Sequence, residues 1–415
     1  MNKIERFVQQ LCQNGVEYKD LGDLGNFYGG LTGKSKKDFQ NGNAKFITYM
    51  NVYSNIALDT AIEDFVRIEE NEKQNIVEYG DVLFTGSSET PDECGMSSVL
   101  TKRISEPLYL NSFCFGFRLN NKDLFIPGFL KYLFRDDKIR EQIKHTASGV
   151  TRFNVSKKRF ENISIPVPPL TIQQEIVTIL DKFTSLEAEL EAELEARKKQ
   201  HEFYRNRLLT PIEIDGQWLI NGKKVEWRKL SEVCRFLNGK GHEKCIVNDG
   251  NYIVVNSKFI STEGRIKKFS NDQFCPLYKN DVLMVMSDLP SGKALAKCFI
   301  VDKDNTYTLN QRICSLSVKN TQILFPKFLF YILNRNKQLL LYDNGADQTN
   351  LRKEDILKIE FPIPTLSEQE RIVTILDKFD ALVNDISKGL PAEIEARREQ
   401  YEYYRNKLLT FKRLS

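Results

Sequence analysis

The chain has 415 residues, of which 41% are hydrophobic and 28% are charged, and its formal net charge is +4. This length is too great for a single ordinary core and suits two to four packed units. No apolar run reaches the roughly 18 residues that a membrane span needs, and the N-terminus lacks the apolar core of a signal peptide, so we expect a cytoplasmic protein.

The first part of the chain, residues 1–160, has the pattern of one globular domain. Strands are expected at 44–52, 81–85 and 113–119, and a helix that opens on a proline is expected at 127–134. The strands are not separated by regular crossover helices. The fold class that we predict is therefore α+β, with mixed strands and short helices, and not a doubly wound sheet.

A long spacer helix is expected within residues 161–212. Its apolar residues recur at alternating steps of three and four from Ile176 to Leu208, which is the pattern of a coiled-coil seam. About 35 helical residues span roughly 50 Å, so such a helix could hold two globular units apart. The aromatic cluster near its end, Phe203-Tyr204, and its counterpart in the second repeat, Tyr401, Tyr403 and Tyr404, are assigned to the seam and are expected to pack there and not to stack on bases.

Residues 213–356 have the pattern of a second α+β domain. Strands are expected at 252–255, 281–286 and 312–318, and a second helix that opens on a proline is expected at 326–333.

A second long helix is expected within residues 357–415, with a seam from Ile372 to Leu408. It carries about one extra turn near Gly389, where Gly followed two residues later by Pro391 can interrupt it and start a new segment.

The chain is therefore an internal duplication with the order variable domain, near-identical helix, variable domain, near-identical helix. Two divergent domains on a matched pair of helices are the arrangement expected of a protein that recognises two different ligands, one with each domain. The matching segments are IVTILDKF at 176–183 and 372–379, EARKKQHEFYRNRLLT at 195–210 and EARREQYEYYRNKLLT at 395–410, DVLF at 81–84 and DVLM at 281–284, and Asn-Val at 154–155 and Asn-Leu at 350–351.

Basic and amide side chains gather in Gly-rich loops at comparable places in both halves. Lys, Ser and Thr in such loops can approach a phosphate backbone, while Asn, Gln and Arg can read base edges through paired hydrogen bonds. Any single loop of this kind is more often a solvated turn. The candidate DNA-binding residues are Lys34, Ser35, Lys36, Lys37, Ser87, Thr151, Arg152, Asn154 and Lys157 in the first half, and Lys240, His242, Lys244, Lys267, Lys293, Gln348, Asn350 and Arg352 in the second.

Catalytic and metal-binding motifs are not evident. The segment 29–35 resembles a phosphate-binding loop, but its first glycine is one residue too close to Gly33-Lys34-Ser35. No Gly-x-Gly-x-x-Gly loop is present, and eight scattered cysteines without a Cys-x-x-Cys pair favour free thiols over a zinc site. We therefore expect a non-catalytic DNA reader. The alternatives are an enzyme with methyl-transfer or nucleotide-hydrolysis activity and a coiled-coil adaptor that binds protein and not DNA.

The layout resembles the specificity subunits of type I restriction-modification systems over nearly the whole chain. The most specific segments are IPVPPLTIQQEIVTILDKF at 165–183 and FPIPTLSEQERIVTILDKF at 361–379, the two Tyr-Arg-Asn-x-Leu-Leu-Thr helix ends at 204–210 and 404–410, and GGLTGKSKKDF at 29–39.

This resemblance implies two target-recognition domains, each reading one half of an asymmetric bipartite site in double-stranded DNA. It implies two antiparallel helices that set the gap and dock two modification subunits, and two restriction subunits that complete the enzyme. It places S-adenosylmethionine, ATP and Mg²⁺ on those partner subunits, with no cofactor or metal in this chain. It also implies that residues 4–11 pack near the end of the second long helix.

Overall fold

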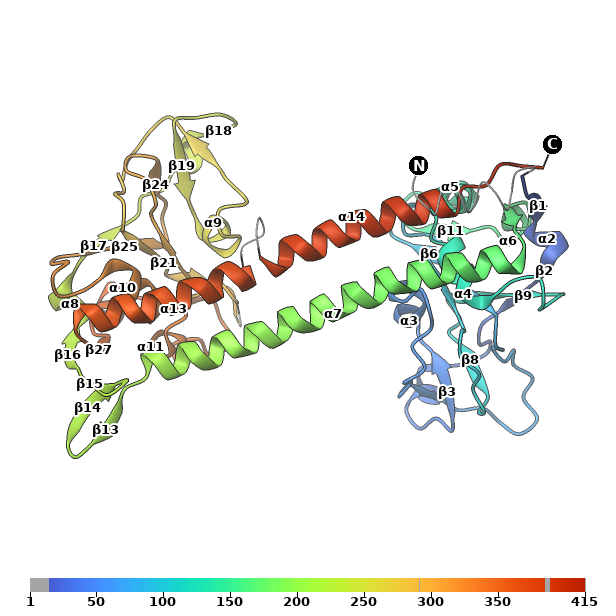
Figure 1. The fold of residues 1–415 in the computed structure, drawn as a ribbon, viewed down its shortest axis with the longest axis horizontal. Coiled ribbons are helices and arrows are strands. Elements are labelled where there is room, and N and C mark those ends of the chain that lie inside the picture. Colours follow the sequence, from blue (N-terminus) through green and yellow to red (C-terminus); the bar gives the residue numbers. More distant parts are fainter. Residues whose placement is uncertain (1–14, 291, 385–388, 415) are drawn as a thin grey trace. The chain divides into compact units, whose positions relative to one another are not determined.

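The computed structural model describes residues 15–290, 292–384 and 389–414. The chain forms two compact units, and the first unit combines residues from both ends of the sequence (Figure 1). It comprises 1–192 and 393–415, whereas the second unit is the continuous stretch 193–392. The expected contact of residues 4–11 lies outside the described residues.

The first unit is built around a four-stranded antiparallel sheet in the order β2-β9-β5-β7 and a three-stranded sheet in the order β4-β3-β8. In chain order its elements are β1 (Glu17–Asp20), α2 (Leu21–Leu24), β2 (Gly25–Gly29), the 3-10 helix η1 (Lys36–Phe39), β3 (Ala44–Ile47), α3 (Tyr49–Ser54), β4 (Phe65–Val66), β5 (Val82–Thr85), β6 (Ser87–Ser88), β7 (Ser97–Val99), β8 (Leu108–Leu110), β9 (Cys114–Leu119), α4 (Pro127–Leu133), α5 (Asp137–Thr146), β10 (Ala147–Ser148), β11 (Phe153–Val155), α6 (Lys157–Phe160), β12 (Ser164–Val167) and the first part of α7 (Leu170–Leu209).

The second unit repeats this arrangement with a sheet in the order β17-β25-β21-β23. After the rest of α7, its elements are β13 (Ile212–Ile214), β14 (Gln217–Ile220), β15 (Lys223–Lys224), β16 (Glu226–Lys229), α8 (Leu230–Val233), β17 (Cys234–Asn238), the 3-10 helix η2 (Glu243–Cys245), β18 (Ile246–Val247), β19 (Tyr252–Val255), α9 (Ser257–Ser261), β20 (Phe269–Ser270), β21 (Val282–Val285), β22 (Ser287–Asp288), β23 (Cys298–Ile300), β24 (Tyr307–Leu309), β25 (Ile313–Val318), α10 (Pro326–Leu333), α11 (Lys337–Leu340), β26 (Thr349–Asn350), α12 (Lys353–Leu357), β27 (Glu360–Ile363) and α13 (Leu366–Asn384).

The duplicated strands β5 and β21 lie in the centre of each core. All four residues of each strand are buried, which explains why both read as continuous apolar runs and do not alternate. In register, Val82 faces Phe117 across the first sheet and Val282 faces Leu316 across the second. The α+β class and the internal repeat predicted from the sequence are therefore confirmed.

One predicted strand is too long. The expected strand at 44–52 ends at Ile47, and α3 begins at Tyr49. Thr48 is the N-cap of this helix, because its hydroxyl accepts a hydrogen bond from the backbone N–H of Asn51 at 3.2 Å. The capping threonine ends the strand, although the residues that follow have good strand propensity.

Each unit contains a pair of antiparallel helices that close on the predicted seam. In the first unit, Phe183 of α7 stacks on Tyr404 of α14 (Leu390–Leu408), with ring centroids 5.4 Å apart. In the second unit, Tyr204 of α7 stacks on Phe379 of α13 at 5.5 Å. The same Phe–Tyr pair is thus formed twice, once in each unit, which confirms that these aromatic residues pack on the seam.

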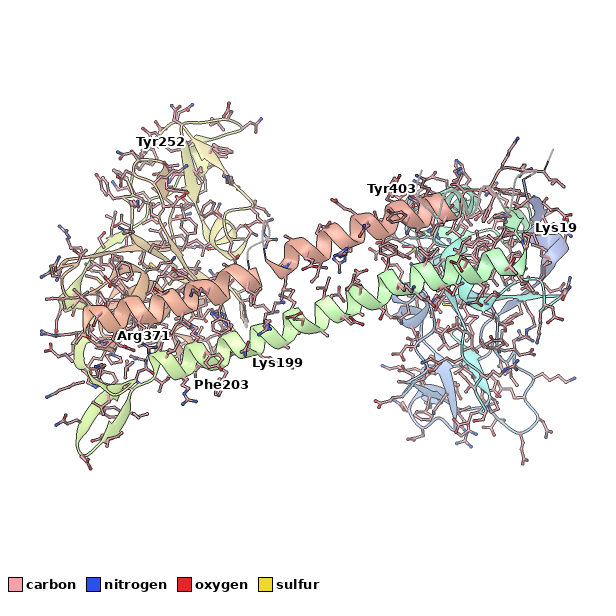
Figure 2. The ribbon with its side chains drawn as sticks, viewed as in Figure 1. Lys19, Lys199, Phe203, Tyr252, Arg371 and Tyr403 are labelled. Atoms are coloured by element: carbon pink, nitrogen blue, oxygen red, sulfur yellow. The ribbon has the colours of Figure 1, made fainter. Side chains whose placement is uncertain are left out.

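For Phe203 and Tyr403 the prediction of packing on the seam was wrong, because each lies one position away from the seam residue that follows it. Phe203 and Tyr403 are both 58% exposed and lie on the outer faces of their helices (Figure 2). In the described part of the chain, the second long helix comprises α13, described to Asn384, and α14, which begins at Leu390 directly after a bend at Gly389. Pro391 stands in the first turn of α14, as predicted, where a missing N–H costs no hydrogen bond.

Among the described residues, no helix is long and apolar enough to cross a bilayer. In that same part of the chain, no group of three or more His, Cys, Asp or Glu side chains gathers as metal ligands would. Seven described cysteines are free thiols. Burial raises the pKa of the Cys114, Cys234 and Cys314 thiols to about 12, so these groups are protonated and unreactive at neutral pH.

Candidate nucleic-acid interface

A short three-stranded ribbon in the first unit brings together candidate residues that are far apart in the sequence. Its central strand β11 pairs with β6 on one side and β10 on the other, and Asn154 faces Ser87 in register. Arg152, which immediately precedes β11, donates from Nε and Nη2 to the Ser87 hydroxyl oxygen at 3.1 and 2.9 Å. Both Arg152 and Asn154 are exposed. The structure therefore joins three of the predicted residues in one cluster.

The second unit contains the matching ribbon. Strands β22 and β26 pair so that Asn350 faces Ser287, as Asn154 faces Ser87 in the first unit. Gln348 donates from Nε2 to the Ser287 hydroxyl at 2.7 Å. Its position two residues before Asn350 corresponds to that of Arg152 before Asn154. Both halves therefore present a buried serine, an exposed asparagine and one exposed side chain bound to the serine, and that side chain differs between them.

An open depression of 520 Å³ adjoins the ribbon of the first unit. Arg152 and Thr151 line it together with the exposed ring of Phe113, and the Arg152 guanidinium lies 5.5 Å from the centre of that ring. Two carboxylates, Glu89 and Glu93, also line the depression. It therefore offers a planar cation, an aromatic face and hydrogen-bond acceptors within one concave surface.

Glu93 is held in its ionised form. Its carboxylate accepts hydrogen bonds from the Tyr53 hydroxyl at 2.8 Å and from the Ser88 hydroxyl at 3.2 Å. These bonds, chiefly the one from Tyr53, lower the pKa of Glu93. The depression consequently holds negative charge beside the Arg152 cation at neutral pH.

An exposed lysine follows each ribbon at the start of a short helix. Lys157 begins α6 and lies 5.5 Å above the centre of the Phe115 ring, and Lys353 begins α12 and lies 5.6 Å above the Phe236 ring. Both ammonium groups thus occupy comparable places with an aromatic face beneath them. Lys157 was among the predicted residues, whereas Lys353 was not.

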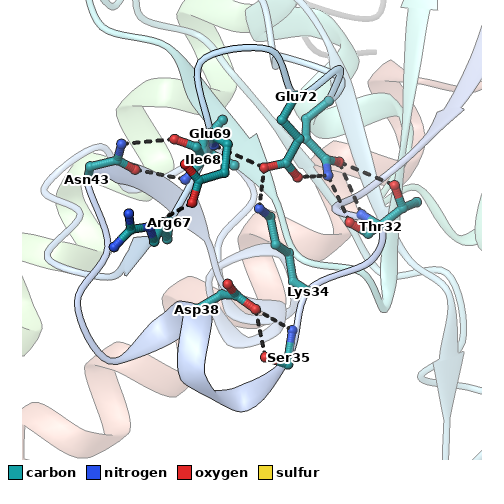
Figure 3. Close-up of polar contacts among 10 residues, drawn as sticks. Thr32, Lys34, Ser35, Asp38, Asn43, Arg67, Ile68, Glu69 and Glu72 are labelled. Atoms are coloured by element: carbon teal, nitrogen blue, oxygen red, sulfur yellow. Dashed lines mark hydrogen bonds and ion pairs between the residues drawn. The ribbon is translucent and has the colours of Figure 1, made fainter.

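The basic segment of the first unit is largely engaged in internal contacts (Figure 3). Lys34 is 8% exposed and its ammonium forms an ion pair with Glu72 at 2.5 Å, which lowers the pKa of that carboxyl to about 2. Ser35 donates from its backbone N–H and its hydroxyl to Asp38, each at 2.7 Å. Lys36 and Lys37 are exposed. Lys34 therefore has a structural role that its sequence context did not reveal.

His242 is completely buried, so its side chain is not accessible to DNA. Its Nδ1 lies 2.7 Å from the Lys240 carbonyl oxygen and its Nε2 lies 3.0 Å from the Thr308 hydroxyl. The ring also lies against Phe274, with centroids 4.8 Å apart. A histidine in a Gly-Lys-Gly-His loop had suggested a surface position, but these bonds explain its place in the interior.

The other predicted residues of the second unit are exposed but are not joined to its ribbon by any hydrogen bond or ion pair in the described part of the chain. They are Lys240, Lys244 of η2, Lys267 in the loop before β20, Lys293 in the loop after β22, and Arg352 immediately before α12.

Sequence reasoning missed several residues of the ribbons and of the depression. Ser287 could have been found from the sequence, because aligning DVLF at 81–84 with DVLM at 281–284 makes it the equivalent of Ser87. The depression residues Tyr49, Phe113 and Glu93 carry no such signal. They come from three separate segments that only the folded sheet brings together.

Comparisons with known proteins identify the family to which the chain belongs. The family model described as "Type I restriction modification DNA specificity domain" matches residues 13–196 and again 222–396. Each match covers one globular domain and the beginning of the helix that follows it. The chain belongs to this family of type I restriction-modification specificity subunits and contains two copies of its domain.

Individual relatives carry the same description. The chain is 34% identical over 279 residues to the specificity subunit of the type I restriction enzyme EcoR124I/EcoR124II of Escherichia coli, a match that covers 62% of this chain and 64% of that protein. It is 30% identical over 272 residues to a putative specificity subunit of Haemophilus influenzae, covering 64% of this chain and 68% of the relative. The match to the first relative thus spans just under two thirds of its length.

Solved structures share the fold at low sequence identity. One of them was solved in work on complex assembly and conformational transition of the type I restriction-modification system. It matches with a TM-score of 0.62 at 16% identity, covering 95% of this chain and 97% of that one. The type I specificity subunit of M. genitalium matches with a TM-score of 0.50 at 13% identity, covering 95% and 96%.

Proposed function

We propose that this chain is the non-catalytic subunit that determines which DNA sequence a type I restriction-modification enzyme recognises. Each unit reads one half of an asymmetric bipartite site in double-stranded DNA. The observation that carries the proposal is the duplicated ribbon. Ser87 with Asn154 and Ser287 with Asn350 form the same frame, but Arg152 and Gln348 occupy the variable position. A common frame with a different reading side chain suits two different half-sites.

The exposed lysines of both units suit the phosphate backbone. Lys36, Lys37 and Lys157 in the first unit and Lys244 and Lys353 in the second are exposed lysines. Phosphate contacts of this kind position a protein on DNA and make the affinity fall steeply with salt, by a logarithmic slope of about 0.9 for each phosphate neutralised. We expect the DNA affinity of the chain to show this dependence, with base contacts from the ribbons adding sequence preference.

The chemistry belongs to partner subunits in this proposal. Two modification subunits carry S-adenosylmethionine and methylate adenine, and two restriction subunits use ATP and Mg²⁺. The helix pairs α7–α14 and α7–α13 serve as their docking scaffold and hold the gap between half-sites constant.

The test is an adenine methylation map of a methylation-free host that carries the cognate modification subunit, with and without this chain. The expected result is a two-part motif with a fixed gap that appears only when the chain is present. If a soluble complex forms and no motif appears, the proposal fails. DNA footprinting then decides whether the chain is an adaptor that binds protein only, since an adaptor protects no bipartite site.

A further inference from the structure

The variable position of the two ribbons carries side chains with different base preferences. Arg152 and Gln348 are each bound to the hydroxyl of the serine in the neighbouring strand, at 2.9 and 2.7 Å. Both side chains are exposed, whereas Ser87 and Ser287 are each 6% exposed. A buried serine thus holds one edge of an exposed side chain in each unit and leaves the rest of that side chain toward solvent.

The bonds to Ser87 leave a specific part of Arg152 available. They use Nε and one hydrogen of Nη2, so the end of the guanidinium that carries Nη1 and the second Nη2 hydrogen faces away from the serine. Two parallel donors at this spacing match O6 and N7 of guanine in the major groove. Phe113 stacks near the guanidinium at 5.5 Å and further limits its rotation.

The bond to Ser287 leaves a different pair of groups on Gln348. It uses one Nε2 hydrogen, so the second Nε2 hydrogen and Oε1 remain. One donor beside one acceptor matches N7 and the N6 amino group of adenine. The bond to serine therefore leaves Arg152 with hydrogen-bonding groups that match guanine and leaves Gln348 with groups that match adenine.

Charge in the first unit favours a base edge over a phosphate at Arg152. Glu89 and Glu93 line the depression that contains Arg152. These carboxylates repel a phosphate but not the neutral edge of a base pair.

We propose that Arg152 and Gln348 are the specificity-determining residues at equivalent positions of the two half-sites, with Arg152 reading a guanine in one half and Gln348 reading an adenine in the other. This inference rests on the proposed function. It adds that exchanging these two side chain types changes one base in one half-site and leaves the other half and the gap unaltered.

The experiment uses the full chain in complex with its modification subunit and compares the wild type with Arg152→Gln and Gln348→Arg. The methylation map of each variant should keep the gap and one half-site. In the altered half-site, Arg152→Gln should no longer require a guanine at one position, and Gln348→Arg should no longer require an adenine at one position. The matched control is Arg228→Gln, which makes the same chemical change at an exposed residue of β16 whose ion-pair partner is Glu226.

Binding to synthetic duplexes covers the case in which a variant no longer methylates. Replacing the proposed guanine should weaken wild-type binding on the order of ten- to a hundred-fold, and should change the affinity of Arg152→Gln by about two-fold or less. If Arg152→Gln discriminates every base pair of the site as the wild type does, the inference is overturned while the proposed function stands. If the wild type itself yields no bipartite motif, the proposed function fails first.

Discussion

Asp136 is buried at the N-terminus of α5 and is 2% exposed. One carboxylate oxygen accepts the Lys138 backbone N–H at 3.0 Å, and Oδ1 has no hydrogen-bond partner in the described part of the chain. The duplicated position in the second unit is Asn336, whose Oδ1 accepts the Gln338 N–H and whose Nδ2 donates to the Ile332 carbonyl at 3.1 Å. Both polar atoms of the Asn336 amide form hydrogen bonds, whereas only one carboxylate oxygen of Asp136 does.

We predict that Asp136→Asn stabilises the first unit by about 1–2 kcal/mol at neutral pH, because the new N–H can donate to a helix carbonyl as Asn336 does. Burial raises the pKa of Asp136 in the folded state. The wild type therefore loses stability as the pH rises from the ordinary pKa of an unfolded Asp through the raised folded value, and the variant does not.

Urea denaturation at neutral pH and at about pH 4 measures this difference. The advantage of the variant should shrink at about pH 4, because unfolded Asp136 is then about half protonated and the folded carboxyl, with its raised pKa, is protonated to a greater extent. Asp136→Ala is the control, because it removes the charge and also the cap, and it should not stabilise the unit. An advantage of Asp136→Asn that is independent of pH would contradict the explanation.

At the scale of elements, α5 connects α14 to the β6–β11–β10 ribbon within the first unit. Its first residue, Asp137, accepts hydrogen bonds from Arg405 of α14 at 2.8 Å and Asn406 at 2.6 Å. In its middle, Arg140 donates to the carbonyl oxygens of Asp92, Cys94 and Gly95 at 2.6–2.8 Å. The chain then passes directly from α5 into β10 of the ribbon. Arg140 thus fixes the loop between β6 and β7, residues 89–96, through three hydrogen bonds to its backbone.

We predict that Arg140→Met loosens this loop. Three carbonyl groups lose their donor, so the free energy of local opening should fall by about 1–3 kcal/mol. Hydrogen exchange of residues 89–96 should accelerate, and discrimination should weaken in the half-site that we propose the first unit reads. Residues 289–295 are the internal control, because in the second unit Arg335 holds that loop by a bond to the Leu295 carbonyl at 3.0 Å. Equal acceleration of both loops would contradict a local role for Arg140.

At the scale of the whole molecule, the first and last described segments of the chain meet in the first unit. Val16 donates to the Lys412 carbonyl at 2.8 Å, Leu414 donates back to Val16 at 2.9 Å, and the Tyr18 hydroxyl donates to the Phe411 carbonyl at 3.0 Å. Leu408, Leu409 and Phe411 are buried in the core of this unit. The second unit is continuous and needs neither end.

We predict that truncation after Ala392 destabilises the first unit alone. It removes four buried apolar side chains, those of Ile394, Leu408, Leu409 and Phe411, each worth about 1.5–3 kcal/mol, and exposes the seam of α7 from Ile176 to Phe183. Calorimetry should show one transition shifted to much lower temperature and another close to its wild-type position. A shift of both transitions by the same amount would contradict the division into these two units.

The sequence by itself determined the duplication, the α+β class, the helix seams and the family. Each depends on local periodicity or on repeated strings such as IVTILDKF, which remain legible without three-dimensional contacts. It also supplied Ser87, Arg152, Asn154, Gln348 and Asn350 as members of one candidate set, because polar residues recur at matched places in both halves.

Only the tertiary structure decided which of those residues stand together. Ser87 meets Arg152 across 65 positions of sequence, and Gln348 meets Ser287 across 61, through strand pairs too short for any periodic signal. The structure likewise turned Lys34 toward Glu72 and buried His242 against Thr308. A charge or an imidazole in a Gly-rich loop has the same local sequence whether it faces solvent or a partner, and the partner is supplied by a distant segment of the fold.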